Sequence, residues 1–235
     1  MLREANGSFY AQDTRSVNGD LESYGTFFHF LIKEPKHPKD STQPRDGFDG
    51  YSWHKLAFVT KWHSSGGTTV FCFNLPYDSI NSERTIRKDI QDTFTQISSN
   101  EPFAIHAILV GHVVAMYNTA LWAWRHEVRY LEKRRAFEHD PDPDYRGMHE
   151  MARHIIHMSE TLDTAIITAS SMLEEQTVFL SENPSLPQDA VLQSRCTSKE
   201  LRHHVTMLRC LHKRSQALEK RLDNEINLVC LHLSF

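Results

Sequence analysis

The chain has 235 residues, enough for one large domain or two small ones with a substantial core. Its 26 Lys and Arg residues against 30 Asp and Glu residues give a formal charge of −4, which predicts no broad basic surface and no nucleic-acid partner. With 40% hydrophobic residues, nine Gly and nine Pro, the composition excludes collagen-like and disordered proteins. Fifteen histidines are an unusual number, and protonation of all of them would change the charge to +11.

The N-terminal part of the chain is predicted to contain a tail, a strand and a loop. Residues 1–20 are polar and lack a hydrophobic period, so we expect a disordered tail. The segment Tyr24–Ile32 is rich in aromatic and β-branched side chains, which is typical of a β-strand. A polar loop that contains several prolines follows it over Lys33–Gly50.

A β-hairpin and a helix are predicted next. The apolar segments Leu56–Trp62 and Thr68–Leu75 are separated by a short glycine-bearing turn, the pattern of two antiparallel strands. The segment Asn81–Ile97 then places apolar residues three and four positions apart, which predicts an amphipathic helix. We therefore expect residues 21–100 to form a small α/β unit.

One stretch of the chain is long enough to span a membrane. Residues Phe103–Trp124 carry no formally charged side chain over 22 positions. They include His106, His112 and Asn118, however, which are costly to place in hydrocarbon. A helix that is apolar on all sides also fits the core of a protein in water. We therefore expect a buried helix here and no transmembrane segment in this chain.

Residues 101–235 are predicted to form a bundle of three very long antiparallel helices. The first runs from about Pro102 to Phe137 and ends at a turn that contains two prolines. The second runs from about Met148 to Leu180. The third opens with the capping-box pattern of Thr197–Glu200. The predicted fold class is α+β, with the α/β unit followed by this bundle as one continuous module.

The two later helices carry apolar stripes of near-heptad period, which are typical of a coiled coil or a helical bundle. The stripe of the second helix consists of Met151, Ile155, Met158, Leu162, Ala165, Ala169, Met172 and Phe179. The seam of the third helix consists of Leu201, Leu208, Leu211, Leu218, Leu222 and Val229. Ser215 and Glu225 interrupt that seam, so it is imperfect as a self-sufficient coiled coil.

Two histidines are candidate metal ligands. His154 and His157 are three residues apart on the second helix and share a face, so both could bind one metal ion. The motif HExxH is absent, and the single E-x-x-H pattern, Glu200 with His203, has no second copy to complete a di-metal site. The alternative interpretation, histidines that are hydrogen-bonded within a helix bundle, is favoured.

Motifs for catalysis and cofactor binding are absent from the sequence. It contains no G-x-S-x-G nucleophile elbow, no Walker loop and no G-x-G-x-x-G pattern. The four cysteines, which form no C-x-x-C pair, are predicted to be reduced thiols of a cytoplasmic protein. We therefore predict no catalytic residue, no cofactor-binding residue and no enzymatic activity.

A basic run closes the first long helix. Its members are Arg125, Arg129, Lys133, Arg134 and Arg135. Cations at this end of a helix complement its dipole, which favours a solvated helix end. Such a run can also contact an anion or a phospholipid, so contact with a membrane surface is an alternative.

Several short segments are distinctive. They are Phe58–Trp62 with Cys72–Pro76, Pro102–His106, Arg125–Lys133, Arg153–Leu162 and Arg221–Leu228. These segments resemble the fungal subgroup of CorA-type transporters of Mg²⁺ and other divalent cations, over residues 50–228 of this chain. The resemblance implies the fold of the CorA cytoplasmic domain, a cytoplasmic location and membership of the magnesium transporter family.

The sequence departs from that family at its C-terminus. In such transporters the last long helix continues into two membrane spans with a Gly-Met-Asn signature, whereas this sequence ends at Val229–Phe235 with neither. We therefore expect a truncated relative without its own pore, and no pore residue carries over to it. The resemblance implies that any bound ion is Mg²⁺ or another divalent cation, held by carboxylates between subunits.

Three functional hypotheses follow. The first is a CorA-like cytoplasmic module with a regulatory or interaction role, whose partner is a second copy of the chain or a full-length CorA-like relative. The second is a His-rich helical metal-binding enzyme that uses His154, His157 and His203. The third is a protein held at a membrane surface by the Phe103–Trp124 stretch and the basic run.

Overall fold

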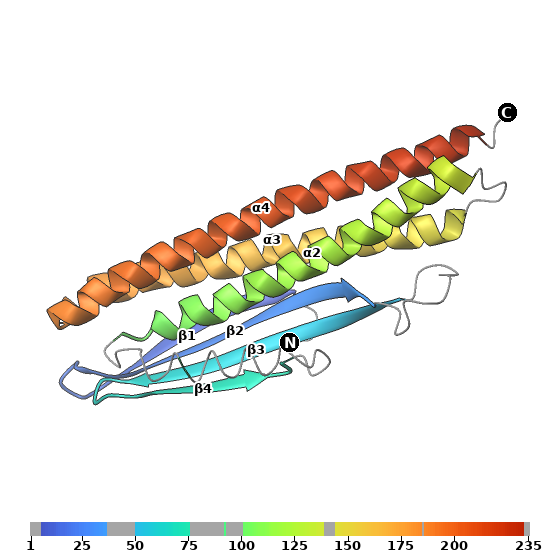
Figure 1. The fold of residues 1–235 in the computed structure, drawn as a ribbon. Helices are drawn as coiled ribbons and strands as arrows, with labels where there is room; N and C mark the ends of the chain where they lie inside the picture. Colours follow the sequence, from blue (N-terminus) through green and yellow to red (C-terminus); the bar gives the residue numbers. More distant parts are fainter. Residues whose placement is uncertain are drawn as a thin grey trace.

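The computed structural model of the chain describes residues 6–36, 50–75, 92, 101–138, 144–184 and 186–232. Figure 1 shows a four-stranded sheet with three helices lying along one of its faces. The helices contain 35, 38 and 45 residues. The fold is therefore α+β, as the sequence predicted. The helix predicted over Asn81–Ile97 lies outside the described residues, apart from Asp92.

The sheet is antiparallel, and its strands lie side by side in chain order: β1 (Gly7–Arg15), β2 (Leu21–Pro35), β3 (Tyr51–His63) and β4 (Thr68–Phe73). Strand β2 contains the predicted strand and extends beyond both of its ends. Strands β3 and β4 form the predicted hairpin. In its turn, Gly66 has a φ of 104°, a conformation that glycine adopts without the steric penalty of a side chain.

Strand β1 corrects the expectation that residues 1–20 form a disordered tail. The segment Gly7–Arg15 pairs along its whole length with β2. Phe9 lies opposite Phe28, and the centroids of the two rings are 6.5 Å apart. The hydrophobic alternation of β1 is too weak to predict a strand from the sequence. The strand is stabilised instead by backbone hydrogen bonds to the longer strand β2.

Helices α2 (Ala104–Glu138) and α3 (Tyr145–Glu182) match the first two predicted helices, and Figure 1 shows that α3 runs antiparallel to both of its neighbours. Helix α4 (Gln188–His232) begins earlier than predicted, so the expected capping box is wrong. Thr197 lies inside α4, and its hydroxyl donates to Oε2 of Glu101 at 3.2 Å instead of capping the helix.

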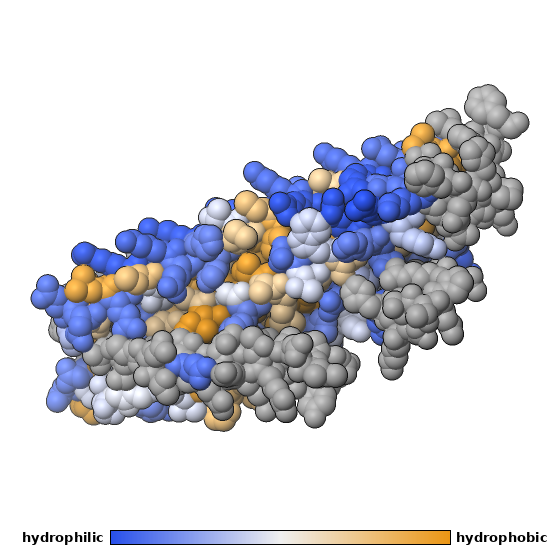
Figure 2. All heavy atoms as spheres, viewed as in Figure 1, coloured by the Kyte–Doolittle hydropathy of each residue, from blue (hydrophilic) through white to orange (hydrophobic). Residues whose placement is uncertain are grey.

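The three helices form two layers. Helices α2 and α3 contact the sheet, whereas α4 contacts α2 and α3 but no strand within the described ranges. The stripe predicted for α3 and the seam predicted for α4 are buried, which confirms both. Ser215 is accommodated in the seam because its hydroxyl donates to Oγ of Ser159 at 3.1 Å. Figure 2 shows hydrophilic side chains over the outer surface of α4, with hydrophobic side chains gathered between the helices and the sheet.

The apolar stretch Phe103–Trp124 lies almost entirely in α2. The region Ala104–Lys133 is the one helical segment, among the residues described, that is long and apolar enough to cross a membrane, and 61% of its apolar 18-residue window is buried inside this structure. Nε2 of His106 lies 2.7 Å from Oγ1 of Thr26, and burial lowers the pKa of His106 to about 3, so the ring is neutral at pH 7. The structure confirms the burial predicted for this helix.

Candidate functional site

The two candidate metal ligands, His154 and His157, contact a buried lysine. Nζ of Lys33 lies 2.8 Å from Nδ1 of His154 and 3.0 Å from Nδ1 of His157. The spacing of three residues on α3 places both rings toward the end of β2, where Lys33 is only 1% exposed. The prediction that the two histidines share a face is therefore correct, and the group that they share is an ammonium.

Aromatic rings complete the surroundings of this lysine. Its Nζ lies 4.0 Å from the ring centroid of Tyr51 and 4.7 Å from that of Trp53. Trp53 is the residue opposite Lys33 in the β2–β3 pairing, so the strand register brings its ring there. From α2, the indole of Trp124 donates to the backbone carbonyl of Lys33 at 2.9 Å. The cluster thus connects β2, β3, α2 and α3, and the faces of the rings favour a cation.

The charges of this cluster are set mainly by burial. Burial lowers the pKa of Lys33 to about 8, and the charge of Arg153 lowers it further. Burial also lowers the pKa of His154 to about 4, with smaller contributions from Lys33, His157 and Arg153. At neutral pH Lys33 is therefore mostly an ammonium and His154 is neutral. Because an ammonium only donates hydrogen bonds, both Nδ1 atoms accept from it.

These contacts bear on the metal hypothesis. The observed arrangement is a set of hydrogen-bonded histidines, and no group of three or more His, Cys, Asp or Glu side chains in the described ranges is placed to hold a metal ion. Metal binding by His154 and His157 stays a prediction, and it would need their Nε2 atoms or the displacement of Lys33. His203, the third histidine of the enzyme hypothesis, lines a different cavity, between α2 and α4.

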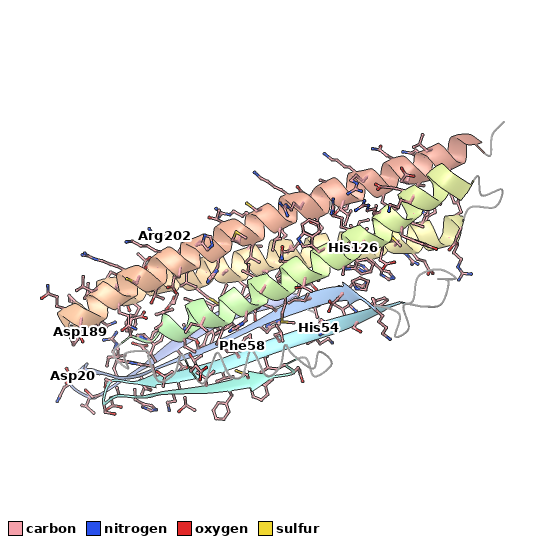
Figure 3. All side chains as sticks on the ribbon, viewed as in Figure 1. Asp20, His54, Phe58, His126, Asp189 and Arg202 are labelled. Carbon is pink, nitrogen blue, oxygen red and sulfur yellow. The ribbon has the colours of Figure 1, made fainter. Side chains whose placement is uncertain are left out.

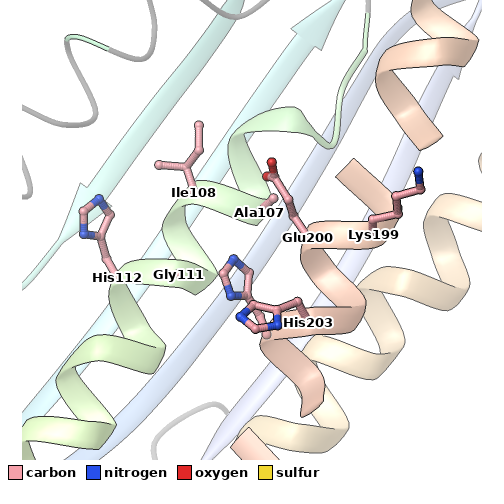
Figure 4. A pocket seen from close by; sticks show the side chains of 8 residues that line it. Ala107, Ile108, Gly111, His112, Lys199, Glu200 and His203 are labelled. Carbon is pink, nitrogen blue, oxygen red and sulfur yellow. The ribbon is translucent and has the colours of Figure 1, made fainter. Parts of the chain in front are cut away.

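That cavity has a volume of about 570 Å³ and is wide open. Figure 4 shows its lining side chains, which come from two helices: Ala107, Ile108, Gly111 and His112 from α2, and Lys199, Glu200, His203 and His204 from α4. A Cβ atom at Gly111 would lie 3.2 Å from the ring of His204, so glycine permits the close approach of that ring to α2. Burial lowers the pKa of His204, and the charge of His203 adds to this effect.

A buried carboxyl lies where the start of α2 meets α3 and α4. Glu101 is 3% exposed, and its Oε1 accepts from the backbone N–H of Phe103 at 3.1 Å and from Nε2 of Gln176 at 3.4 Å. The hydroxyl of Ser194 donates to the same oxygen at 3.4 Å, and that of Thr197 donates to Oε2 at 3.2 Å. All four donors are neutral, and no described Lys, Arg or His forms an ion pair with Glu101.

Burial determines how this carboxyl titrates. Burial raises the pKa of Glu101 to about 7, against the opposing effect of the four hydrogen bonds, of which the bond from Phe103 contributes most. A group with this pKa gains or loses a proton near neutral pH. We call this set, Glu101 with Phe103, Gln176, Ser194 and Thr197, the Glu101 junction.

Lys33 and Glu101 were both missed by sequence reasoning. Lys33 begins a run of charged residues and prolines that is typical of a loop, so nothing in that run indicates burial. The sequence gives a weak indication for Glu101. This residue comes directly before Pro102 and a long apolar segment, which places its carboxyl at the start of a buried helix.

Comparisons with known proteins give limited similarity. No family model matches the chain. The "Notoamide biosynthesis cluster protein M'" of Aspergillus versicolor is 27% identical over 214 residues, which cover 85% of this chain and 43% of that protein. This chain therefore spans less than half of the length of that relative. The crystal structure of the ZntB cytoplasmic domain from Vibrio parahaemolyticus aligns with a TM-score of 0.43 and 8% identity, over 95% of this chain and 74% of that one. At these levels neither protein assigns a family or an activity to this chain.

Proposed function

We propose that this chain is a regulatory and interaction module of the CorA-like type, in which the packing of α2, α3 and α4 responds to protonation or to a bound ligand. The observation that carries the proposal is the Glu101 junction. It places one buried carboxyl, which among the described residues accepts from neutral donors alone, in contact with side chains of α3 and α4 and with the start of α2. A change of charge at this carboxyl therefore alters contacts between all three helices at once.

The ligand that the CorA-like segments imply is Mg²⁺ or another divalent cation. Such ions bind carboxylate oxygens: Mg²⁺ is usually held by one or two carboxylates and keeps several waters, whereas Ca²⁺ takes six to eight oxygen ligands. No group of three or more His, Cys, Asp or Glu side chains in the described ranges is placed to hold a metal ion, so we infer that a second copy, or residues outside these ranges, contribute carboxylates to the cation site. For this reason the proposed partner is a second copy of the chain or a full-length CorA-like relative, in the cytoplasm.

Thermal unfolding and light scattering together test this function. We expect millimolar Mg²⁺ to raise the melting temperature and to change the mass of the assembly. We also expect the Glu101 carboxyl to lower the melting temperature as the pH rises from about 5 to about 8, because its ionised form is unfavourable in the folded chain. The lowered pKa values of His106 and His154 act in the opposite direction up to about pH 6.5, so the effect of Glu101 is measured as a difference from a variant. The gap in melting temperature by which the Glu101→Gln variant exceeds the unmodified chain should grow as the pH rises over this range, and the variant should retain the response to Mg²⁺. A difference in melting temperature between Glu101→Gln and the unmodified chain that stays constant with pH, together with unchanged melting and unchanged mass in Mg²⁺, would contradict the proposal.

A further inference from the structure

A second cavity lies between α2 and α4, with a volume of about 280 Å³. Leu121 and Leu218 form its buried lining, and Trp122 is 38% exposed beside them. Three arginines surround the same cavity: Arg125 from α2, and Arg214 and Arg221 from α4. The cavity thus combines an apolar lining with three side chains that stay cationic at every physiological pH.

Among the described residues, a carboxylate pairs with one of these arginines. Arg221 forms a bidentate ion pair with Glu132, with Nε–Oε1 at 2.9 Å and Nη2–Oε2 at 2.7 Å. Arg125 and Arg214 instead lie near the indole of Trp122, with their Cζ atoms 4.6 Å and 5.8 Å from a ring centroid. No carboxylate in the described part of the chain forms an ion pair with either of them. Within the described ranges, three cations and one carboxylate therefore leave two positive charges without an ion-pair partner.

This arrangement indicates the charge and the shape of a ligand. Two guanidinium groups held near one ring repel each other, and a bound anion removes that repulsion. A phosphomonoester carries a charge of about −1.5 to −2 at pH 7, which balances the two unpaired cations. Its oxygens also match the planar fork of a guanidinium better than a single point charge does. The leucine side chains and the exposed indole offer contact to an apolar organic group.

We propose that this cavity binds a small soluble phosphomonoester. Arg125 and Arg214 hold the phosphate, and the organic part of the ligand lies against Leu121 and Leu218. Glu132 fixes the position of Arg221 at the edge of the site. Because the cavity is slightly smaller than the roughly 300–1,000 Å³ usual for ligand sites, the ligand is small. This proposal does not depend on the Glu101 junction or on a bound cation.

Isothermal titration of the full chain with phenyl phosphate tests the site. We expect saturable binding of one molecule per chain. In the double variant Arg125→Gln with Arg214→Gln the affinity should fall by about tenfold or more, because both charge-assisted contacts are lost. The matched control is Arg202→Gln with Arg209→Gln, which removes the same charge from exposed positions of α4 outside this cavity (Arg202 is labelled in Figure 3). The control should bind like the unmodified chain.

Further measurements identify the source of the phosphate. Inorganic phosphate should compete only weakly, because it lacks an organic group to contact the leucines. Absence of saturable binding of phenyl phosphate to the unmodified chain would overturn the proposal, whatever the variants do. Binding only to vesicles that contain phosphatidic acid would overturn the assignment of a soluble ligand. Equal affinity of the two double variants would overturn the role of Arg125 and Arg214.

Discussion

The substitution Glu101→Gln should stabilise the chain in a strongly pH-dependent way. Folding raises the pKa of this carboxyl from 4.5 to about 7. Each tenfold change in proton affinity corresponds to about 1.4 kcal/mol, so the ionised form costs the folded state about 3 kcal/mol. Because the folded-state pKa is raised, the contribution to stability is complete below pH 4.5 and is lost as the pH rises through about 7.

Glutamine at position 101 retains the shape of the side chain but never ionises. Its carbonyl oxygen can accept from Phe103, Gln176 and Ser194, and its amide can donate to the hydroxyl of Thr197, since a hydroxyl both donates and accepts. The stability difference between the variant and the unmodified chain should therefore grow by about 3 kcal/mol between about pH 4.5 and pH 8.

Urea unfolding followed by far-ultraviolet circular dichroism, at several pH values in this range, measures the difference. The matched control is Glu174→Gln, which removes a carboxylate from an exposed position of α3. A difference between Glu101→Gln and the unmodified chain that stays constant with pH would refute the reasoning, because it would mean that folding leaves the proton affinity of Glu101 unchanged. A control variant with the same pH-dependent gain would refute the assignment of the effect to this site.

Three further substitutions test other parts of the structure. Leu208→Ala, in the buried seam of α4, should cost about 2–5 kcal/mol of unfolding free energy in urea, and a loss well below 1 kcal/mol would contradict its packing role. Lys33→Met should raise the pKa of His154 from about 4, because a nearby cation is removed while burial remains; an unchanged imidazole titration by NMR would contradict this. Gly111→Val should destabilise the chain through a clash with the His204 ring, and His204→Ala should relieve part of the loss; strictly additive effects in the double-mutant cycle would exclude that contact.

Periodic patterns in the sequence predicted the regular parts of the fold. Local apolar spacing predicted the hairpin of β3 and β4 and the buried stripes of α3 and α4. Such spacing can be read within a single segment, without knowing which segments pack against it. Strand β1 was not predicted, because Gly7–Arg15 lacks a clear apolar pattern and is stabilised by its pairing with β2. The start of α4 was misplaced because Thr197 has the residue type of a cap but contacts Glu101, which lies 96 positions earlier.

The candidate site was predicted in part. The spacing of His154 and His157 correctly placed both rings on one face of α3, where they meet a common partner. That this partner is Lys33 depends on how β2 is placed against α3, and the two segments are separated by more than 100 residues. Glu101 is hidden for the same reason, since its donors on α3 and α4 lie far along the chain. Patterns of local spacing carry no information about such distant contacts.

The position of α4 in its own layer has a geometric consequence. This helix touches α2 and α3 alone among the described elements, and it extends 35 residues beyond Thr197 to His232. At a rise of 1.5 Å per residue, that part of the helix is about 50 Å long. A tilt of about 5° around Thr197 would therefore displace its far end by about 4–5 Å, while the sheet stays in place. Under the proposed function, an adjustment at the Glu101 carboxyl would therefore be amplified along α4 toward its C-terminal end.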